Sequence, residues 1–267
     1  MSKIDHTFDA LKKRGQAALI PFVMAGDPDL RTTEALIFKM AEAGADMIEL
    51  GVPFSDPFAD GPTIQASSQR ALKNGVNLKE VFLLSNRLKG IKTPLVLMTY
   101  FNPVIQYGLR VFVARCKESG INGVIIPDLP PEEAALWVKE ARSVDLDTIF
   151  LTSPTSPPER IRLVSRLSRG FIYHMSITGV TGARKELSDG LEMDVRRIRE
   201  NSKKPVAVGF GISTPEHAGI ISRFADGVII GSAIVKIIEE NMGKPDQTVK
   251  VRDFVSSLSD ALKSSGR

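Results

Sequence analysis

Eight short apolar segments recur along the chain, and each is followed by a longer segment with the apolar spacing of a surface helix. Most of the apolar segments lack a polar alternate face, which is typical of parallel strands that are buried on both sides. The predicted strands are residues 19–25, 47–51, 95–99, 123–126, 148–151, 171–175, 206–209 and 227–230. The predicted helices are residues 30–43, 78–88, 109–119, 132–144, 158–167, 191–201, 215–224 and 233–240. This alternation restricts the chain to an α/β fold with a parallel sheet.

Two architectures share this order of elements, a closed (β/α)8 barrel and an open doubly wound sheet. The units follow one another without a composition break or a Ser/Gly linker, so we expect one domain over residues 1–267. A barrel needs about 250 residues, and no Gly-x-Gly-x-x-Gly sequence follows the first strand to support a dinucleotide-binding sheet. We therefore expect a single (β/α)8 TIM barrel. An extra N-terminal helix over residues 4–14 could cover its bottom, and a C-terminal helix over residues 251–262 would complete the chain.

Composition and charge exclude several classes of protein. Hydrophobic residues make up 43% of the chain and charged residues 25%, which allows a sizeable core and disfavours disorder. The net charge is only +4, and the basic residues form no stripe, so we expect no nucleic-acid partner. No apolar run can span a bilayer, the N-terminus does not read as a signal peptide, and the lone Cys116 provides no disulfide framework. We expect a cytoplasmic protein without a membrane partner.

A carboxylate stands where an apolar side chain would be expected. Glu49 lies inside the second predicted strand, where an ionised group is costly unless it is paired or neutralised. Asp60 follows eleven residues later, in a loop rich in Pro and Gly. Two carboxyl groups in different environments can hold different pKa values, which is what acid–base catalysis requires. The pair is a candidate catalytic site, although Glu49 could instead pair with a buried cation and Asp60 could cap the next helix.

Glycine-bearing turns follow the last three predicted strands, at residues 178–182, 209–213 and 231–232. In a (β/α)8 barrel these turns lie at the carboxyl end of the strands, where active sites are found. Backbone N–H groups at a glycine-rich helix N-terminus bind anions well. Each turn alone could be an ordinary turn, but together they predict a phosphate site.

Other catalytic constellations are missing from the sequence. His6, His174 and His217 belong to different units and lack metal-ligand spacing, so we expect no metal. His174 should point away from the barrel centre and serve in packing. No lysine lies within a predicted strand, which argues against a Schiff-base aldolase.

Six ordered motifs resemble those of tryptophan synthase alpha subunits, and the resemblance covers nearly the whole chain. The motifs are Glu-Leu-Gly-Val-Pro-Phe-Ser-Asp-Pro at residues 49–57, Ala-Asp-Gly-Pro-Thr-Ile-Gln at 59–65, Pro-Asp-Leu-Pro at 127–130, Thr-Gly-Val-Thr-Gly at 178–182, Val-Gly-Phe-Gly-Ile-Ser at 208–213 and Gly-Ser-Ala-Ile-Val at 231–235. Phe58 and the segment 173–177 depart from the usual pattern, but neither departure changes a carboxylate or a glycine.

The resemblance implies a retro-aldol cleavage of indole-3-glycerol phosphate to indole and glyceraldehyde 3-phosphate. By resemblance, Glu49 would act as acid and then base, Asp60 would stabilise charge on the indole ring, and Tyr173 would help to position both. No cofactor is needed for this reaction, because protonated indole is itself the electron sink.

The same resemblance implies how the substrate is held. Gly182, Gly211, Gly231 and Ser232 would bind the phosphate, largely through backbone amides. The candidate walls of the indole slot are Phe22, Met98 and Phe210, which could equally be plain core residues. We expect the polar stretch 178–189 to act as a lid, with Thr181 reaching Asp60 when the phosphate is bound.

Members of this family work with a beta subunit that carries pyridoxal phosphate, in an alpha2-beta2 heterotetramer. The segments 52–64 and 100–103 expose aromatic residues and prolines at the expected catalytic face, which favours a partner interface, although they could also fold back over the barrel mouth. Two alternatives remain open: a sugar-phosphate isomerase barrel, and a non-catalytic barrel that only activates a beta partner. The presence of both Glu49 and Asp60 disfavours each of them.

Overall fold

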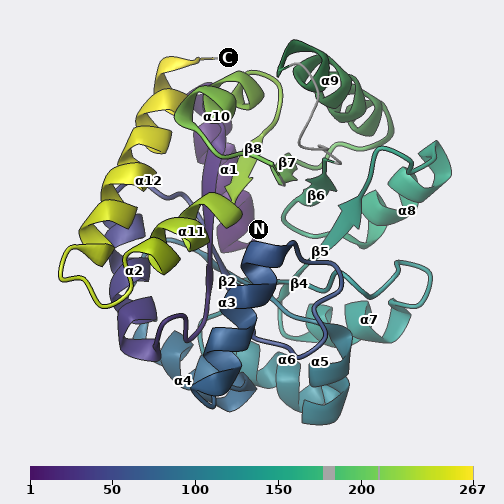
Figure 1. Cartoon of the computed structure of the whole chain (residues 1–267). Helices are drawn as coiled ribbons and strands as arrows, with labels where there is room; N and C mark the ends of the chain where they lie inside the picture. Colours follow the sequence, from purple (N-terminus) through teal and green to yellow (C-terminus); the bar gives the residue numbers. More distant parts are fainter. Residues whose placement is uncertain (177–183, 210, 267) are drawn as a thin grey trace.

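Eight parallel strands close into a barrel in chain order, and the last strand pairs with the first. The computed structural model of the chain describes residues 1–176, 184–209 and 211–266. The strands are β1 (Ala18–Met24), β2 (Ile48–Gly51), β3 (Leu95–Met98), β4 (Gly123–Ile125), β5 (Asp147–Thr152), β6 (Ile172–Met175), β7 (Val206–Gly209) and β8 (Gly227–Ile230). Figure 1 shows the helices arranged around this barrel. The expected fold is confirmed, and each strand end lies within one residue of its predicted position.

Helices follow every strand and cover the outside of the barrel. They are α2 (Leu30–Glu42), α3 (Pro62–Lys73), α4 (Leu78–Arg87), α5 (Phe101–Tyr107), α6 (Leu109–Glu118), α7 (Ala135–Ser143), α8 (Pro158–Leu167), α9 (Arg184–Asn201), α10 (Pro215–Ser222) and α11 (Ser232–Glu240). Two flanking helices, α1 (Lys3–Lys13) and α12 (Gln247–Ser264), confirm the expected additions at the ends of the chain. None of the helices in the described ranges is both long and apolar enough to cross a membrane.

Two helices, α3 and α5, were missed by the sequence prediction. The first begins at Pro62, directly after Gly61, which is a recognised start signal that the Pro-rich context concealed. The second contains Pro103, but this residue occupies the first turn, where proline costs no helical hydrogen bond. Both helices lie directly after loops at the carboxyl ends of the strands, so they help to hold those loops.

Two further boundaries differ from the prediction. The helix predicted from residue 191 begins at Arg184, so half of the stretch 178–189 that was expected to form a lid is helical. Gly190 lies within this helix, where a single glycine is tolerated. The helix α7 begins three residues later than predicted, because a turn closed by the Glu133 N–H on the Pro130 carbonyl precedes it.

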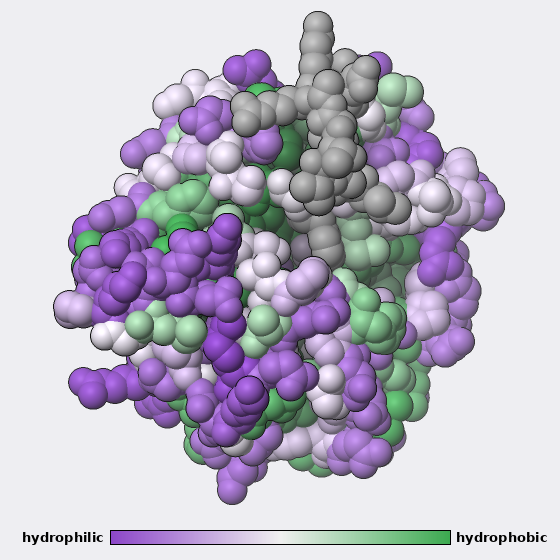
Figure 2. Space-filling model, in the orientation of Figure 1, coloured by the Kyte–Doolittle hydropathy of each residue, from purple (hydrophilic) through white to green (hydrophobic). Residues whose placement is uncertain are grey.

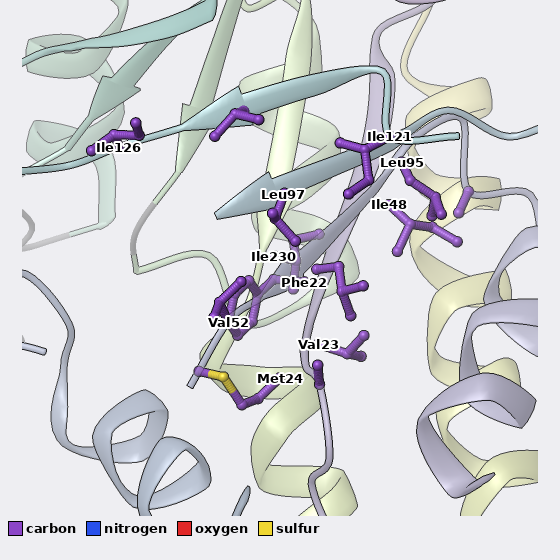
Figure 3. Packing of buried hydrophobic residues seen from close by; sticks show 14 of the residues in the cluster. Phe22, Val23, Met24, Ile48, Val52, Leu95, Leu97, Ile121, Ile126 and Ile230 are labelled. Atoms are coloured by element: carbon purple, nitrogen blue, oxygen red, sulfur yellow. The ribbon is translucent and has the colours of Figure 1, made fainter. Parts of the chain in front are cut away.

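The core has two layers. The strand residues that point outward pack against the helices, and Figure 3 shows part of this layer, where Ile48 of β2 and Leu95 of β3 lie side by side. The strand residues that point inward pack at the bottom of the barrel on Ile4 and Phe8 of α1, whose ring meets Phe171 at 5.6 Å between centroids. The helix α1 therefore closes the bottom of the barrel, and the opposite end is free to hold a site.

Candidate active site

A pocket lies at the carboxyl ends of the strands, and every strand or the loop after it contributes to its wall. Figure 2 shows hydrophilic side chains over most of the face that it presents, with apolar side chains between them near its middle. The residues that line the pocket are Phe22, Glu49, Ala59, Asp60, Gly61, Ile64, Met98, Ile125, Pro127, Leu151, Tyr173, Met175, Gly211, Ile212, Ser213, Ile229, Gly231, Ser232 and Ala233.

Glu49 points into the barrel because its neighbours on β2 point outward. Ile48 and Leu50 pack in the outer layer of the core, and strand alternation turns Glu49 to the pocket side. Its side chain is 1% exposed, and its Oε2 atom has no hydrogen-bond partner among the described residues. Burial, together with the nearby Asp60 carboxylate, raises the pKa of Glu49 to about 8. This carboxyl group therefore keeps its proton at neutral pH.

Asp60 lies on the loop after β2, and its backbone is held from two sides. Its N–H donates to the Pro57 carbonyl at 3.0 Å, and its carbonyl accepts a hydrogen bond of 2.8 Å from the Gln65 side chain. Its Oδ2 atom accepts a hydrogen bond of 3.2 Å from the Tyr100 hydroxyl. Burial raises the pKa of Asp60 to about 6, and the hydrogen bond from Tyr100 opposes this rise. Asp60 is thus mainly ionised at pH 7, in contrast to Glu49.

Tyr173 of β6 lies within the electrostatic reach of both carboxyl groups. Burial raises the pKa of its hydroxyl well above the ordinary value, and the negative charges of Glu49 and Asp60 raise it further. The ring occupies the space beside Gly209, the last residue of β7. A Cβ on Gly209 would collide with the Tyr173 hydroxyl and would come within 2.6 Å of its Cζ.

Glycines and a helix N-terminus form one side of the pocket. Gly211 has a φ of +75°, a left-handed conformation that a residue with a side chain rarely adopts. The helix α11 begins at Ser232, and its N-cap residue Gly231 has no side chain that could cap the first N–H groups. Gly231, Ser232 and Ala233 all line the pocket at this point. Uncapped amides at a helix N-terminus are suited to binding an anion.

The structure brings the predicted residues of the described segments into one pocket. Glu49, Asp60, Tyr173, Gly211, Gly231, Ser232, Phe22 and Met98 all line it. Thr181, Gly182 and Phe210 lie outside the described residues. Sequence reasoning missed several apolar wall residues, which are Ile64, Ile125, Leu151, Met175, Ile212 and Ile229. The wall residues on β4, β5, β6 and β8 occupy the last inward-facing position of their strands. Strand alternation could therefore have predicted them from the sequence.

His174 takes part in packing outside the barrel rather than in the pocket. Its Nδ1 lies 3.1 Å from the Thr152 hydroxyl and its Nε2 lies 3.5 Å from the Asp194 carboxylate on α9. Burial lowers the pKa of this imidazole. Within the described ranges, no three His, Cys, Asp or Glu side chains are grouped so that they could hold a metal ion.

A closed barrel whose mouth combines two carboxyl groups of unequal ionisation with an uncapped helix N-terminus is typical of acid–base enzymes that act on phosphorylated substrates. The sequence model of the family described as Tryptophan synthase alpha chain matches residues 8–263. The chain belongs to this family. It is an enzyme subunit that cleaves indole-3-glycerol phosphate in tryptophan biosynthesis.

Relatives and solved structures match this chain over nearly its whole length. The tryptophan synthase alpha chain of Geotalea uraniireducens is 49% identical over 267 residues, covering 100% of both chains. That of Geobacter sulfurreducens is also 49% identical and covers 98% of this chain and 99% of its own. The structure of the alpha subunit from Legionella pneumophila has a TM-score of 0.93 at 36% identity, with 99% of each chain covered. The open form of tryptophan synthase from Mycobacterium tuberculosis has a TM-score of 0.90 at 34% identity, with 98% of this chain and 99% of that one covered.

Proposed function

We propose that Glu49 moves both protons in the cleavage of indole-3-glycerol phosphate to indole and D-glyceraldehyde 3-phosphate. The observation that carries this proposal is a buried carboxyl group whose Oε2 has no partner among the described residues and whose pKa is raised to about 8. Such a group is protonated at neutral pH and can act as a general acid. The whole chain, residues 1–267, would act as one barrel domain in this reaction.

The two proton transfers of the reaction leave Glu49 in the protonation state in which it began. The neutral Glu49 carboxyl gives its proton to C3 of the indole ring, which becomes an iminium cation. The carboxylate then takes the proton of the adjacent glycerol hydroxyl as the bond to C3 breaks, and the electron pair of that bond re-forms the C2–C3 double bond of indole. Glu49 ends protonated, as it began, and the protonated ring serves as the electron sink.

Asp60 would stabilise the cation that forms between these two steps. Because its pKa is about 6, it is mainly ionised at pH 7, and its negative charge can face the indole N–H. Tyr173 lies close enough to both carboxyl groups for their charges to raise its pKa, which supports a role in positioning Glu49 and the ring.

The pocket wall supports a division between an apolar half and a phosphate half. Phe22 and Met98 line the apolar part, where the indole ring would lie together with Phe210. The phosphate would bind backbone amides at Gly182, Gly211 and Gly231, with the hydroxyl of Ser232 adding a further donor. Thr181 would close over the site and reach Asp60.

The direct test is an assay of indole release from indole-3-glycerol phosphate, with and without a beta subunit of the family. We expect release in both cases. The alternative is a barrel that only activates its partner. It predicts that the chain alone releases no indole and that the Glu49→Gln variant still activates the beta subunit normally. No release in either case would refute the cleavage activity.

We also propose that the chain pairs with a beta subunit in an alpha2-beta2 heterotetramer, and that the pyridoxal phosphate of the complex belongs to the beta subunit. The mouth of the barrel exposes apolar side chains that support such an interface: Phe58, on the loop after β2, is 74% exposed, and Ile105 on α5 is 54% exposed. Exposed apolar residues beside a site commonly mark a protein interface.

A pair of exposed phenylalanines tests this interface. The beta-subunit concentration needed for half-maximal stimulation of indole release should rise about tenfold in Phe58→Ala. An aromatic side chain that becomes buried in an interface contributes strongly to binding. Phe38→Ala is the matched control, since Phe38 is 41% exposed on α2, outside the segments 52–64 and 100–103. Equal stimulation of both variants would show that Phe58 is not part of the interface.

A further inference from the structure

Tyr100 makes the one side-chain hydrogen bond found for the Asp60 carboxylate among the described residues. It is not among the residues that line the pocket, and its hydroxyl meets the pocket wall at Asp60. The residue is 2% exposed and stands directly before α5, forty positions from Asp60 in the sequence. A buried hydroxyl that meets a carboxylate behind the pocket wall suggests a role that acts through that carboxylate.

The direction of the Tyr100 hydroxyl is fixed by a second hydrogen bond. The Ala59 N–H donates to the Tyr100 oxygen at 3.0 Å. The oxygen is therefore an acceptor for Ala59, and its own hydrogen is directed to the Asp60 Oδ2 at 3.2 Å. One hydroxyl thus holds both the backbone and the side chain of the loop segment that carries Asp60.

The ring of Tyr100 is itself fixed by two aromatic residues of the same loop. It stacks on Phe54 at 5.1 Å between centroids with an interplanar angle of 26°, and it meets Phe58 at 5.6 Å. Phe54 is held in turn by Ser68 of α3, whose hydroxyl accepts from the Phe54 N–H and donates to its carbonyl, each at 2.8 Å. The position of the hydroxyl is therefore set by packing rather than by the substrate.

We propose that Tyr100 is a positioning residue for the cleavage reaction, because its hydroxyl holds the Asp60 carboxylate in its charged form and aims it into the pocket. This inference rests on the proposed role of Asp60. A hydrogen bond donated to a carboxylate favours the ionised state. The other titratable groups that face this pair are Glu49 of β2, Tyr173 of β6 and Asp128 after β4, whose carboxylate is held by the Phe101 N–H. None of these three groups brings a positive charge to Asp60. The Tyr100 hydroxyl is therefore the contact that stabilises the Asp60 carboxylate.

The substitution Tyr100→Phe removes the hydroxyl and keeps the stacked ring. Tyr107→Phe is the matched control, since Tyr107 is the last residue of α5, which Tyr100 precedes, and its ring packs against Phe82. For each protein, kcat/KM for indole release is measured from pH 5 to 9, and the Asp60 carboxyl is titrated by ¹³C NMR, with Asp60→Asn identifying its signal. Melting temperatures report any loss of folding.

We expect the acid limb of the Tyr100→Phe profile, and the Asp60 titration, to move to higher pH by about one pH unit, as for the loss of a charge-assisted hydrogen bond. The loss of kcat/KM relative to the wild type should then be about fivefold to tenfold greater at pH 5.5 than at pH 7.5. The Tyr107→Phe profile should match that of the wild type. A loss of rate that is equal at every pH, or an unmoved Asp60 titration, would overturn the proposal. If the wild type releases no indole, the proposed function fails, but the NMR titration still decides whether Tyr100 controls Asp60.

Discussion

At the scale of single residues, two carboxyl groups face one pocket but ionise at different pH. Glu49 is fully buried within a strand, whereas Asp60 lies on a loop and accepts a hydrogen bond. Burial raises both pKa values, to about 8 for Glu49 and to about 6 for Asp60. Because each charge affects the other, the two groups titrate as a pair. Near neutral pH Glu49 is therefore protonated and Asp60 mainly ionised, as their proposed roles require.

A bell-shaped pH profile follows from this pair. We expect kcat/KM for indole release to be highest between about pH 6 and 8. It should fall below pH 6 because Asp60 gains a proton, and above pH 8 because Glu49 loses the proton that it must give to the ring. Steady-state assays from pH 5 to 9.5 provide the check. A rate that still climbs above pH 9 would be incompatible with Glu49 as the acid.

The same burial predicts how stability depends on pH. The folded-state pKa of Glu49 is raised from 4.5 to about 8, so the native state retains a proton that the unfolded state releases. Wild-type stability should therefore decrease as the pH rises from about 4.5 towards 8. Glu49→Gln removes the titrating group. The difference in free energy of unfolding between this variant and the wild type should therefore shift in favour of the variant from pH 5 to pH 8.5, on the order of a few kcal/mol. Urea unfolding at both pH values measures it. An advantage that does not change with pH would show that Glu49 is not neutral in the folded protein.

At the scale of elements, the site depends on how neighbouring strands end. The end of β7 is a glycine because the Tyr173 ring of β6 fills the space that a side chain would need. The helix α11 starts after Gly231, which has no side chain to cap it, and this start opens onto the pocket. Tyr173 and the start of α11 therefore both line the same pocket.

Gly209→Ala should therefore displace Tyr173 and reduce kcat for indole release by about tenfold or more, because small misplacements at a catalytic centre are costly. Gly190→Ala on α9 is the control, since among the described residues beyond its own helical turn no atom lies within 4 Å of its added Cβ. It should leave kcat unchanged and stabilise the helix slightly. Equal kcat values for the two variants would show that the position of Tyr173 is not critical.

Sequence reasoning identified the strand ends and the turn at residues 231–232 because their signals are local, whereas the turn at residues 178–182 lies outside the described residues. Glu49 stands out within an apolar strand, and Gly231 precedes an amphipathic helix. The contact between Tyr100 and Asp60 has no such local signal, because it joins residues forty positions apart through two loops. The helices α3 and α5 were missed for a related reason, since short polar or Pro-containing segments depend on tertiary packing for their stability.

At the scale of the whole molecule, stability and chemistry occupy opposite ends of the barrel. The helix α1 seals the bottom, and Gly123 leaves the space that it needs, since a Cβ there would lie 2.9 Å from the Ile4 Cδ1. The pocket lies at the other end. The barrel itself could be predicted because eight regular repeats exclude most other folds. The fit of α1 into its bottom could only be suggested, because it depends on which inward-facing residues are small.

This separation predicts that the bottom can be weakened without a loss of activity. Ile4 is fully buried, so Ile4→Ala should lower the free energy of unfolding by about 2–5 kcal/mol. The control Ile105→Ala removes a side chain that is 54% exposed and should change it by about 0.5 kcal/mol or less. Urea unfolding gives both values, and kcat for indole release should stay near the wild-type value in each folded variant. A large loss of kcat in folded Ile4→Ala protein would mean that the two ends are coupled.

The most direct test of the account is single-turnover cleavage of indole-3-glycerol phosphate by Glu49→Gln. Glutamine keeps the shape of the side chain but cannot give a proton to C3 or take one from the hydroxyl. We expect the rate of cleavage to fall by about 10²–10⁴-fold, as for the loss of a general acid–base group. The affinity for a non-cleavable phosphate analogue should be retained, because the proposed phosphate site at Gly211 and Ser232 does not depend on Glu49. Cleavage by Glu49→Gln at nearly the wild-type rate would contradict the central role of this residue.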